Sequence, residues 1–511
     1  MSKKIVLLCL IVTTFLVYSI SLDKVPVHLN QDELGFSLNA YSIGKTGFDE
    51  NGRLLPFYFW HLGLMWATPV IVYITAFFLV IFPFSEITIR LPSVFIGTLN
   101  VFLIFVLATK LFSDKKFGLV TAILLASTPI HFIQSRILLD NLFPVPFVLG
   151  WMLFLYLFFS KQKIWLLFLS TFLLGLGIHS YHATKVIMPI YLFITLFLIA
   201  YKIKEKRLLF FFASILAFIL PLLPLIPWLS QYPDTLTDQI RYTGLYDTKL
   251  NPVQGISTLL KPEIIVQRII VYINYFDLEF LFLKGDASLI HSTGRTGVFL
   301  LPFIALLPVG IYSAIKNRNW FNTLLLIGFF TAPAAAALVG NEFRASKELF
   351  ILPFACLLAT SAIKFLLDQK KKIWKFVLVL LLLIIPVQFT YFLYDYFGSY
   401  RERSYNWFNY NIPDALEGLI ANERLKPGSS IYLDDGIYFI DRYWRFYLIK
   451  HHKENLLAKT FYIDTKSFDS KTFPNGSLVL FRFDHQPINL PSKLQAVTEP
   501  DGYISFYIMR L

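Results

Sequence analysis

Long apolar runs separated by short charged connectors constrain what this chain can fold into. Hydrophobic residues make up 56% of its 511 residues, and the mean hydropathy is +0.60. A soluble core does not need that much apolar surface, so we expect a polytopic α-helical membrane protein. About eleven runs approach the roughly 20 residues that one membrane-spanning helix needs. They are 5–22, 91–112, 117–133, 142–160, 164–180, 183–201, 208–230, 298–316, 321–340, 348–367 and 374–394.

The basic connectors predict how these helices are oriented. Lysines and arginines cluster at 3–4, 115–116, 161–163, 202–207, 316–318 and 370–372, and such clusters favour the cytoplasmic side. The net charge of +13 reflects basic residues that face anionic membrane lipids, so we expect no nucleic-acid partner. All six clusters share one side only if the apolar run 57–83 does not cross the membrane. We therefore expect 57–83 to form interfacial helices on the outer face, broken at Pro56, Pro69 and Pro83.

The other side of the membrane collects carboxylates, histidines and arginines, a mixture typical of an active site. It includes the outer loops 23–89 and 231–297 of a membrane module that spans residues 1–394. The composition changes at about residue 395, where turn residues and short alternating stretches begin. Residues 395–511 are expected to form a small extracytoplasmic α/β domain. Its expected strands lie at 430–433, 460–463, 477–483 and 504–508, and its expected helices at 416–420 and 438–450.

Two adjacent acids, Asp32 and Glu33, follow the first apolar run by only about ten residues, and acids near a bilayer are costly and point to function. The sequence has no G-x-G-x-x-G or P-loop motif, so we expect no nucleotide cofactor. A sugar donor for an outward-facing site would instead come from the membrane as a polyprenyl-phosphate sugar. We predict that Asp32 is the base that deprotonates the acceptor hydroxyl. Glu33 or Asp49 would orient Asp32 or bind a metal.

Departure of the lipid phosphate calls for positive charge from arginine and lysine or from a divalent metal cation. The candidate cations are Arg136, Lys185, Arg241, Arg295 and Arg344. The remaining candidate substrate contacts are Asp49, Glu50, Asp140, His182, Asp286 and His291.

The spacing of these candidates leaves some roles open. Arg136 and Asp140 are spaced i, i+4, so on a helix they would share a face and could form an ion pair. Alternatively, Arg136 fixes a phosphate or orients the Asp32 loop. His179 and His182 have no acidic or cysteine partner nearby in sequence, which favours structural or hydrogen-bonding roles over metal ligation. Lys185 either snorkels to the membrane surface or binds a phosphate.

The order of several short motifs resembles the GT-C glycosyltransferases, and most closely the bacterial dolichyl-phosphate-mannose–protein mannosyltransferase-like family, which includes the lipid A aminoarabinose transferases. The motifs are Asp32-Glu33, 45–56, 90–93, 128–136, 180–185, 284–292 and 344–353. They cover roughly residues 1–395. The resemblance implies inverting transfer from a polyprenyl-phosphate sugar, with Asp32 at the position of the family's catalytic aspartate.

The chain departs from the aminoarabinose transferases at two places. The aminoarabinose transferases resemble the pattern Asp-Glu-x-Arg-Tyr here, and Gly35 stands at the place of its arginine. They also have a Glu-Lys before a double proline, where this chain has Arg53-Leu54-Leu55-Pro56. We therefore do not carry over donor-phosphate contacts, and we do not expect aminoarabinose as the sugar. The Trp-Trp-Asp signature of oligosaccharyltransferases is also absent from the sequence.

The expected function is that of an inverting glycosyltransferase in the plasma membrane, with a cytoplasmic N-terminus and an extracytoplasmic site. Its acceptor would be a glycan, lipid or protein of the cell envelope, and membrane lipids would surround it. Two alternatives are a membrane transporter or flippase and a polysaccharide polymerase or ligase that handles lipid-linked glycans. Transporters often show internal repeats, which we do not see in this sequence.

Overall fold

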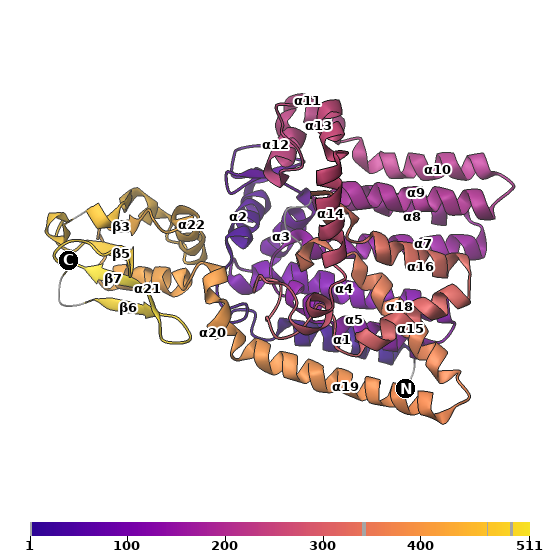
Figure 1. Ribbon diagram of the computed structural model, residues 1–511. Coiled ribbons are helices and arrows are strands. Elements are labelled where there is room, and N and C mark those ends of the chain that lie inside the picture. Colours follow the sequence, from indigo (N-terminus) through magenta and orange to yellow (C-terminus); the bar gives the residue numbers. More distant parts are fainter. Residues whose placement is uncertain (1–2, 340–343, 468, 491–493) are drawn as a thin grey trace.

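The computed structural model describes residues 3–339, 344–467, 469–490 and 494–511, so residues 341–343 of an expected outer connector lie outside the described part. The chain forms a helical bundle and a smaller α/β domain at one end of it (Figure 1). The bundle ends with α19 (Lys372–Phe397), close to the boundary expected at residue 394.

The apolar runs fold as helices because a helix satisfies its own backbone hydrogen bonds, which lipid cannot do. The other bundle helices are α1 (Lys3–Ser19), α2 (Gln31–Thr46), α3 (Pro69–Ile81), α4 (Glu86–Phe112), α5 (Lys115–Ala126), α6 (Pro129–Gln134), α7 (Val145–Lys161), α8 (Ile164–Gly177), α9 (Thr184–Lys202), α10 (Arg207–Ile219), α11 (Leu225–Gln231), α12 (Asp234–Thr243), α13 (Pro252–Leu259), α14 (Pro262–Asn274), α15 (Phe303–Lys316), α16 (Trp320–Thr331), α17 (Ala334–Val339) and α18 (Ile351–Leu367).

Six helical stretches of the described chain are long and apolar enough to cross a membrane. They are 86–112, 140–161, 184–202, 207–231, 320–339 and 372–397, and each coincides with an expected run. The other five expected runs contain shorter helices, so the number of spans stays a prediction. The single helix expected over 117–133 is wrong, because α5 ends at Ala126 and α6 begins at Pro129. Proline lacks the N–H that a continuous helix would need there.

The apolar run 57–83 is only partly helical. Its first half is a β-hairpin of β1 (Phe59–His61) and β2 (Met65–Ala67), in which His61 pairs with Met65. The expected interfacial helix is therefore wrong for this half. The second half, α3, has 13 residues, about 20 Å of helix, which is shorter than the roughly 30 Å hydrocarbon core. Since α8 and α15 have only 14 residues each, the non-crossing course of 57–83 stays a prediction.

The two ends of the bundle differ in what they carry (Figure 1). The start of α1 and the turns that join α9 to α10 and α18 to α19 lie at one end. Those turns belong to the basic clusters 202–207 and 370–372, so three of the six clusters lie at the same end. The C-terminal domain lies at the opposite end.

The C-terminal domain is built on one mixed sheet. Its five strands have the order β4-β3-β5-β7-β6, with β3 parallel to β4 and β5, and β7 antiparallel to β5 and β6. The strands and the preceding and packed helices are β3 (Ile431–Asp434), β4 (Thr460–Ile463), β5 (Leu478–Arg482), β6 (Gln495–Thr498), β7 (Ile504–Arg510), α20 (Tyr400–Ser404), α21 (Ile412–Leu425) and α22 (Ile440–Lys450). The strand β6 was not expected, since only one of its residues, Val497, is buried.

Candidate active site

The site begins with the N-terminal turn of α2, which carries both acids of the Asp32-Glu33 pair. Asn30 caps this helix by accepting a hydrogen bond from the Asp32 N–H at 2.8 Å. Glu33 completes a capping box, since its Oε2 accepts a hydrogen bond from the Asn30 N–H at 2.9 Å. Two carboxylates at a helix N-terminus are stabilised by the helix dipole. The local sequence therefore places both acids in the first turn of α2.

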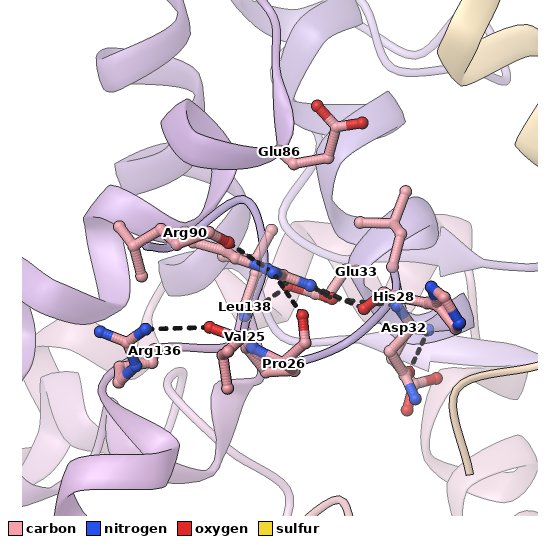
Figure 2. A network of polar contacts seen from close by, with 12 residues as sticks. Val25, Pro26, His28, Asp32, Glu33, Glu86, Arg90, Arg136 and Leu138 are labelled. Carbon is pink, nitrogen blue, oxygen red and sulfur yellow. Dashed lines mark hydrogen bonds and ion pairs between the residues drawn. The ribbon is translucent and has the colours of Figure 1, made fainter. Parts of the chain in front are cut away.

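Glu33 points into the protein and is fully buried. Arg90 of α4 holds it through two hydrogen bonds, Nε to Oε1 at 2.8 Å and Nη2 to Oε2 at 2.9 Å. The Leu138 N–H donates to the same carboxylate at 3.1 Å. With its oxygens engaged in this way (Figure 2), Glu33 is a structural anchor. The expected catalytic or metal-binding role of Glu33 stays a prediction, and these contacts do not favour it.

Arg90 also gathers the loop that leads to Asp32. Its guanidinium donates to the backbone oxygens of Leu22 at 2.6 Å, Pro26 at 3.3 Å and His28 at 2.8 Å (Figure 2). Only 1% of the Arg90 side chain is exposed, so these acceptors replace the water that the charge would otherwise bind. The sequence motif 90–93 contained Arg90, but the residue was not expected to organise the site.

Arg136 holds the same loop from its other end. It donates to the backbone oxygens of Tyr18 at 2.6 Å, Ile20 at 2.6 Å and Val25 at 3.0 Å. The guanidinium also lies over the ring of Tyr396, 5.5 Å from its centroid. The expected ion pair with Asp140 does not form. Of the open roles, these contacts favour the one in which Arg136 orients the Asp32 loop.

Asp32 points away from Arg90 and Glu33 (Figure 2). Its side chain is 45% exposed and lines a cavity of about 490 Å³. The Nε2 atom of His61 lies 3.2 Å from Asp32 Oδ1. Two neighbouring acids therefore have opposite environments, and of the two only Asp32 lines the cavity.

The cavity brings together segments that are far apart in sequence. Five of the expected site residues line it, namely Asp32, Asp140, His182, His291 and Arg344. Polar lining residues that were not expected are Gln31, His61, Asn141, Tyr181, Gln239, Tyr242, Thr243, Ser346 and Lys347. Lys347 lies three residues after Arg344, so the charged segment was a sequence signal for it. No motif pointed to His61, which comes from the hairpin.

Two of the three histidines that line the cavity, His182 and His291, are neutral. Burial lowers the pKa of His182 to about 3 and the pKa of His291 to about 4. The Gln134 amide donates to His291 Nδ1 at 2.8 Å, while Gln134 Oε1 accepts from Asn141 at 3.3 Å. This arrangement leaves the hydrogen of His291 on Nε2. Neither histidine supplies positive charge at neutral pH.

Two acids of the first outer loop lie outside the cavity lining. Asp49 Oδ2 accepts from Arg53 Nε at 2.8 Å, and Asp49 Oδ1 accepts from the Asn51 N–H at 2.9 Å. Glu50 pairs with Arg442 at 3.1 Å and Arg445 at 2.6 Å. Asp49 shapes a turn, and Glu50 ties the end of α2 to α22. Substrate contact by Asp49 and Glu50 and metal binding by Asp49 stay predictions that these contacts do not favour.

Three further candidates support the structure instead of lining the cavity. Arg241 is exposed and pairs with Asp238 within α12. Arg295 pairs with Asp395 at 3.1 Å, near the end of α19. Lys185 donates to Gln239 and lies 5.3 Å from the centroid of the Tyr58 ring. The expected substrate contacts of Arg241, Arg295 and Lys185 stay predictions that these contacts do not favour. Lys185 does hold Gln239, which lines the cavity.

Asp286 acts on the segment that carries Arg344 and Lys347. It is buried, and its Oδ2 accepts a hydrogen bond from the Ala345 N–H at 2.6 Å. Its Oδ1 accepts from the Ser288 N–H at 2.8 Å. The carboxylate fixes the backbone between two cationic residues of the cavity. Substrate contact by Asp286 stays a prediction that these contacts do not favour.

Comparison with known proteins places this geometry in context. Residues 67–230 match the model of the family described as dolichyl-phosphate-mannose-protein mannosyltransferase. The structure of ArnT from Cupriavidus metallidurans bound to undecaprenyl phosphate matches with a TM-score of 0.56 at 12% identity, over 99% of this chain and 98% of that chain. This protein has the GT-C fold. The resemblance to a mannosyltransferase-like GT-C family is confirmed, and the chain is a multi-pass membrane protein.

Two structures from Archaeoglobus fulgidus share this GT-C fold. The oligosaccharyltransferase in complex with Zn and sulfate matches with a TM-score of 0.51 at 14% identity, over 97% of this chain and 72% of that chain. The oligosaccharyltransferase AglB in complex with an inhibitory peptide and a dolichol-phosphate matches with a TM-score of 0.50 at 13% identity, over 86% and 64%. No curated protein sequence matches this chain.

The residues that the structure describes do not form a typical metal site. Within the described part of the chain, no group of three or more His, Cys, Asp and Glu side chains could hold one. Glu33 and Asp49, the expected metal ligands, are engaged by Arg90 and Arg53. Asp32 and His61 form a pair, which is too few ligands for a typical site. The chemistry is therefore derived from the side chains alone.

The Arg90–Glu33 pair yields a test of the anchor. Replacing Arg90 by Met leaves a carboxylate buried without its partner, a change that typically costs about 3–5 kcal/mol. We expect Arg90→Met to lower the melting temperature in detergent strongly and to abolish any activity that depends on Asp32. The matched control is Lys45→Met, an exposed cation on α2, which should leave the melting temperature unchanged. An unaltered melting temperature for Arg90→Met would contradict the anchor role.

Proposed function

We propose that this protein is an inverting glycosyltransferase that moves a sugar from a polyprenyl-phosphate donor to a cell-envelope acceptor hydroxyl. The observation that carries the proposal is the placement of Asp32. Its carboxylate is partly exposed in a cavity that Arg344 and Lys347 also line, while its neighbour Glu33 is withdrawn into the protein. A base and cations in one cavity suit transfer of a sugar from a phosphate.

The proposed reaction is a single displacement. The acceptor hydroxyl gives its proton to the Asp32 carboxylate, and its oxygen forms a bond to the anomeric carbon of the donor sugar. The bond between that carbon and the phosphate oxygen breaks, and the polyprenyl phosphate leaves with the electron pair. Attack from the face opposite the leaving phosphate inverts the configuration at the anomeric carbon.

Charge that develops on the departing phosphate would be stabilised by Arg344 and Lys347. Asp286 fixes the backbone between these two residues through Ala345, so the cations are presented from an ordered segment. His182 and His291 are neutral and would contribute hydrogen bonds to the sugar or phosphate without adding charge. A stabilising contact of this kind is effective because it is arranged before the reaction.

The donor class is inferred from the membrane setting. ArnT was solved with undecaprenyl phosphate and AglB with a dolichol-phosphate, and these lipids support a polyprenyl-phosphate donor here. The acceptor would be a glycan, lipid or protein. The donor sugar would be a hexose or a pentose.

The sidedness of the reaction follows from the same proposal. The Asp32 loop contacts the C-terminal domain, as in the pair of His28 with Glu499, and that domain lies opposite the start of α1 and the basic turns (Figure 1). We propose that residues 1–394 form the catalytic membrane module and that 395–511 form an extracytoplasmic domain. The N-terminus is then cytoplasmic in the plasma membrane.

Replacement of Asp32 tests the base. Purified full-length protein in nanodiscs would be supplied with the total lipid extract and envelope fraction of a deletion strain, and release of free polyprenyl phosphate would be followed by mass spectrometry. We expect Asp32→Asn to lower the rate by about 10²- to 10⁴-fold, because general base catalysis contributes factors of this size. The matched control is Asp23→Asn, an exposed acid of the same loop, which should release at the wild-type rate. No release by the wild type, or equal release by Asp32→Asn, would refute the proposed function.

A reporter experiment tests the sidedness. Alkaline phosphatase fused after residue 115, in a basic connector, should stay inactive because it remains in the cytoplasm. The same reporter fused after residue 511 should be active, because the C-terminal domain is placed outside. The opposite pattern would show that the site faces the cytoplasm, where a lipid-linked donor has no evident advantage over a nucleotide sugar.

A further inference from the structure

His61 is the nearest side-chain partner of the proposed base. It ends β1, and its Nε2 lies 3.2 Å from Asp32 Oδ1. The His61 side chain is 6% exposed, whereas the Asp32 side chain is 45% exposed. The hydrogen bond therefore joins a buried ring on the protein side to a carboxylate that opens into the cavity.

The chemistry of the pair fixes which atom donates. A carboxylate only accepts hydrogen bonds, so the His61 ring must carry a hydrogen on Nε2. His61 Nδ1 is buried and has no hydrogen-bond partner in the described residues. Asp32 makes no other side-chain hydrogen bond within the same part of the chain. One oxygen of Asp32 is thus held by the ring, and the other is left for a substrate.

Gly35 makes room for this ring on α2. It stands three residues after Asp32, on the same side of the helix. A Cβ atom at position 35 would lie 2.4 Å from His61 Cε1 and 2.5 Å from His61 Nδ1, which is too close for any side chain. The next residue, Phe36, packs against the ring with centroids 4.4 Å apart. An arginine at position 35, as in the pattern of the aminoarabinose transferases, would therefore clash with the His61 ring in this chain.

We propose that His61 is the positioning residue of Asp32, and that Gly35 is required for its access. By holding Oδ1, the ring fixes the carboxylate plane so that Oδ2 faces the acceptor hydroxyl. The Asp32 side chain is then already ordered before the substrate binds, which lowers the entropic cost of reaching the reactive geometry. This inference rests on the proposed function, because it assigns the orientation of the same base. His61 acts through Asp32, so its loss slows the chemical step without weakening donor binding.

The experiment compares two replacements of His61 in the nanodisc assay. Glutamine keeps an amide N–H near the position of Nε2, whereas phenylalanine keeps the ring shape and loses the donor. We expect His61→Gln to retain a maximal rate within about threefold of wild type, and His61→Phe to lose about 10- to 100-fold, the usual cost of losing a supporting hydrogen bond at a site. The lipid-extract dilution that gives the half-maximal rate should stay the same in both variants.

A second pair of variants keeps the test decisive if His61→Phe does not fold. Gly35→Ala should displace the ring and lower the maximal rate like His61→Ala does. The double variant Gly35→Ala/His61→Ala should be no slower than His61→Ala alone, because the two changes remove the same contact. Fully additive losses would overturn the steric part of the proposal.

The outcomes separate this inference from the proposed function. Undiminished release by Asp32→Asn would refute the base itself. If Asp32→Asn is inactive while His61→Phe keeps the wild-type rate, only the positioning role is overturned. Equal losses in His61→Gln and His61→Phe would overturn it as well, since the donor would then not matter. A His61→Gln defect that added manganese repairs would instead identify His61 as a metal ligand and overturn hydrogen-bond positioning.

Discussion

The buried pair of Arg90 and Glu33 is the interaction on which the site depends. A charge removed from water is tolerated only when its partners replace that water, and Arg90 has five acceptor contacts, two on Glu33 and three on backbone oxygens of the loop. The first turn of α2 and the loop before it are therefore fixed to α4. Because Arg90 holds Glu33 inside the protein, the adjacent Asp32 side chain faces the cavity.

The C-terminal domain completes this arrangement from outside the bundle. Tyr443 Oη donates to the Leu29 backbone oxygen at 2.8 Å, and His28 pairs with Glu499 at 2.7 Å. Arg442 and Arg445 hold Glu50 beyond the C-terminal end of α2. The loop and helix that carry Asp32 are thus held between the membrane module and the sheet domain. The membrane module and the C-terminal domain together therefore hold the site in place.

The sequence predicted the features that depend on composition and period. Apolar runs and basic connectors indicated the helices, and the proximity of Asp32 to the first run indicated the acid of the cavity. The sequence could not separate Asp32 from Glu33, because adjacent helix residues point about 100° apart and only the packing of α4 shows which faces inward. The sequence could not decide the role of Arg136 either, since one of its acceptors is the backbone oxygen of Tyr18, 118 residues earlier in the chain.

His61 shows the limit of sequence inference more clearly. It lies in an apolar stretch whose hydrophobicity resembles an interfacial helix, yet Trp60 and Trp66 pair across a short hairpin. Long-range packing, not local propensity, decides such short strands. The contact with Asp32 therefore appears only once the chain has folded.

The most direct measurement is a cryo-electron microscopy structure of the protein in nanodiscs with a non-transferable polyprenyl-phosphonate sugar. The account predicts the sugar in the cavity with its anomeric carbon on the Asp32 side and its phosphonate against the segment of Arg344 and Lys347. A headgroup bound elsewhere, with Asp32 out of reach of the sugar, would contradict it.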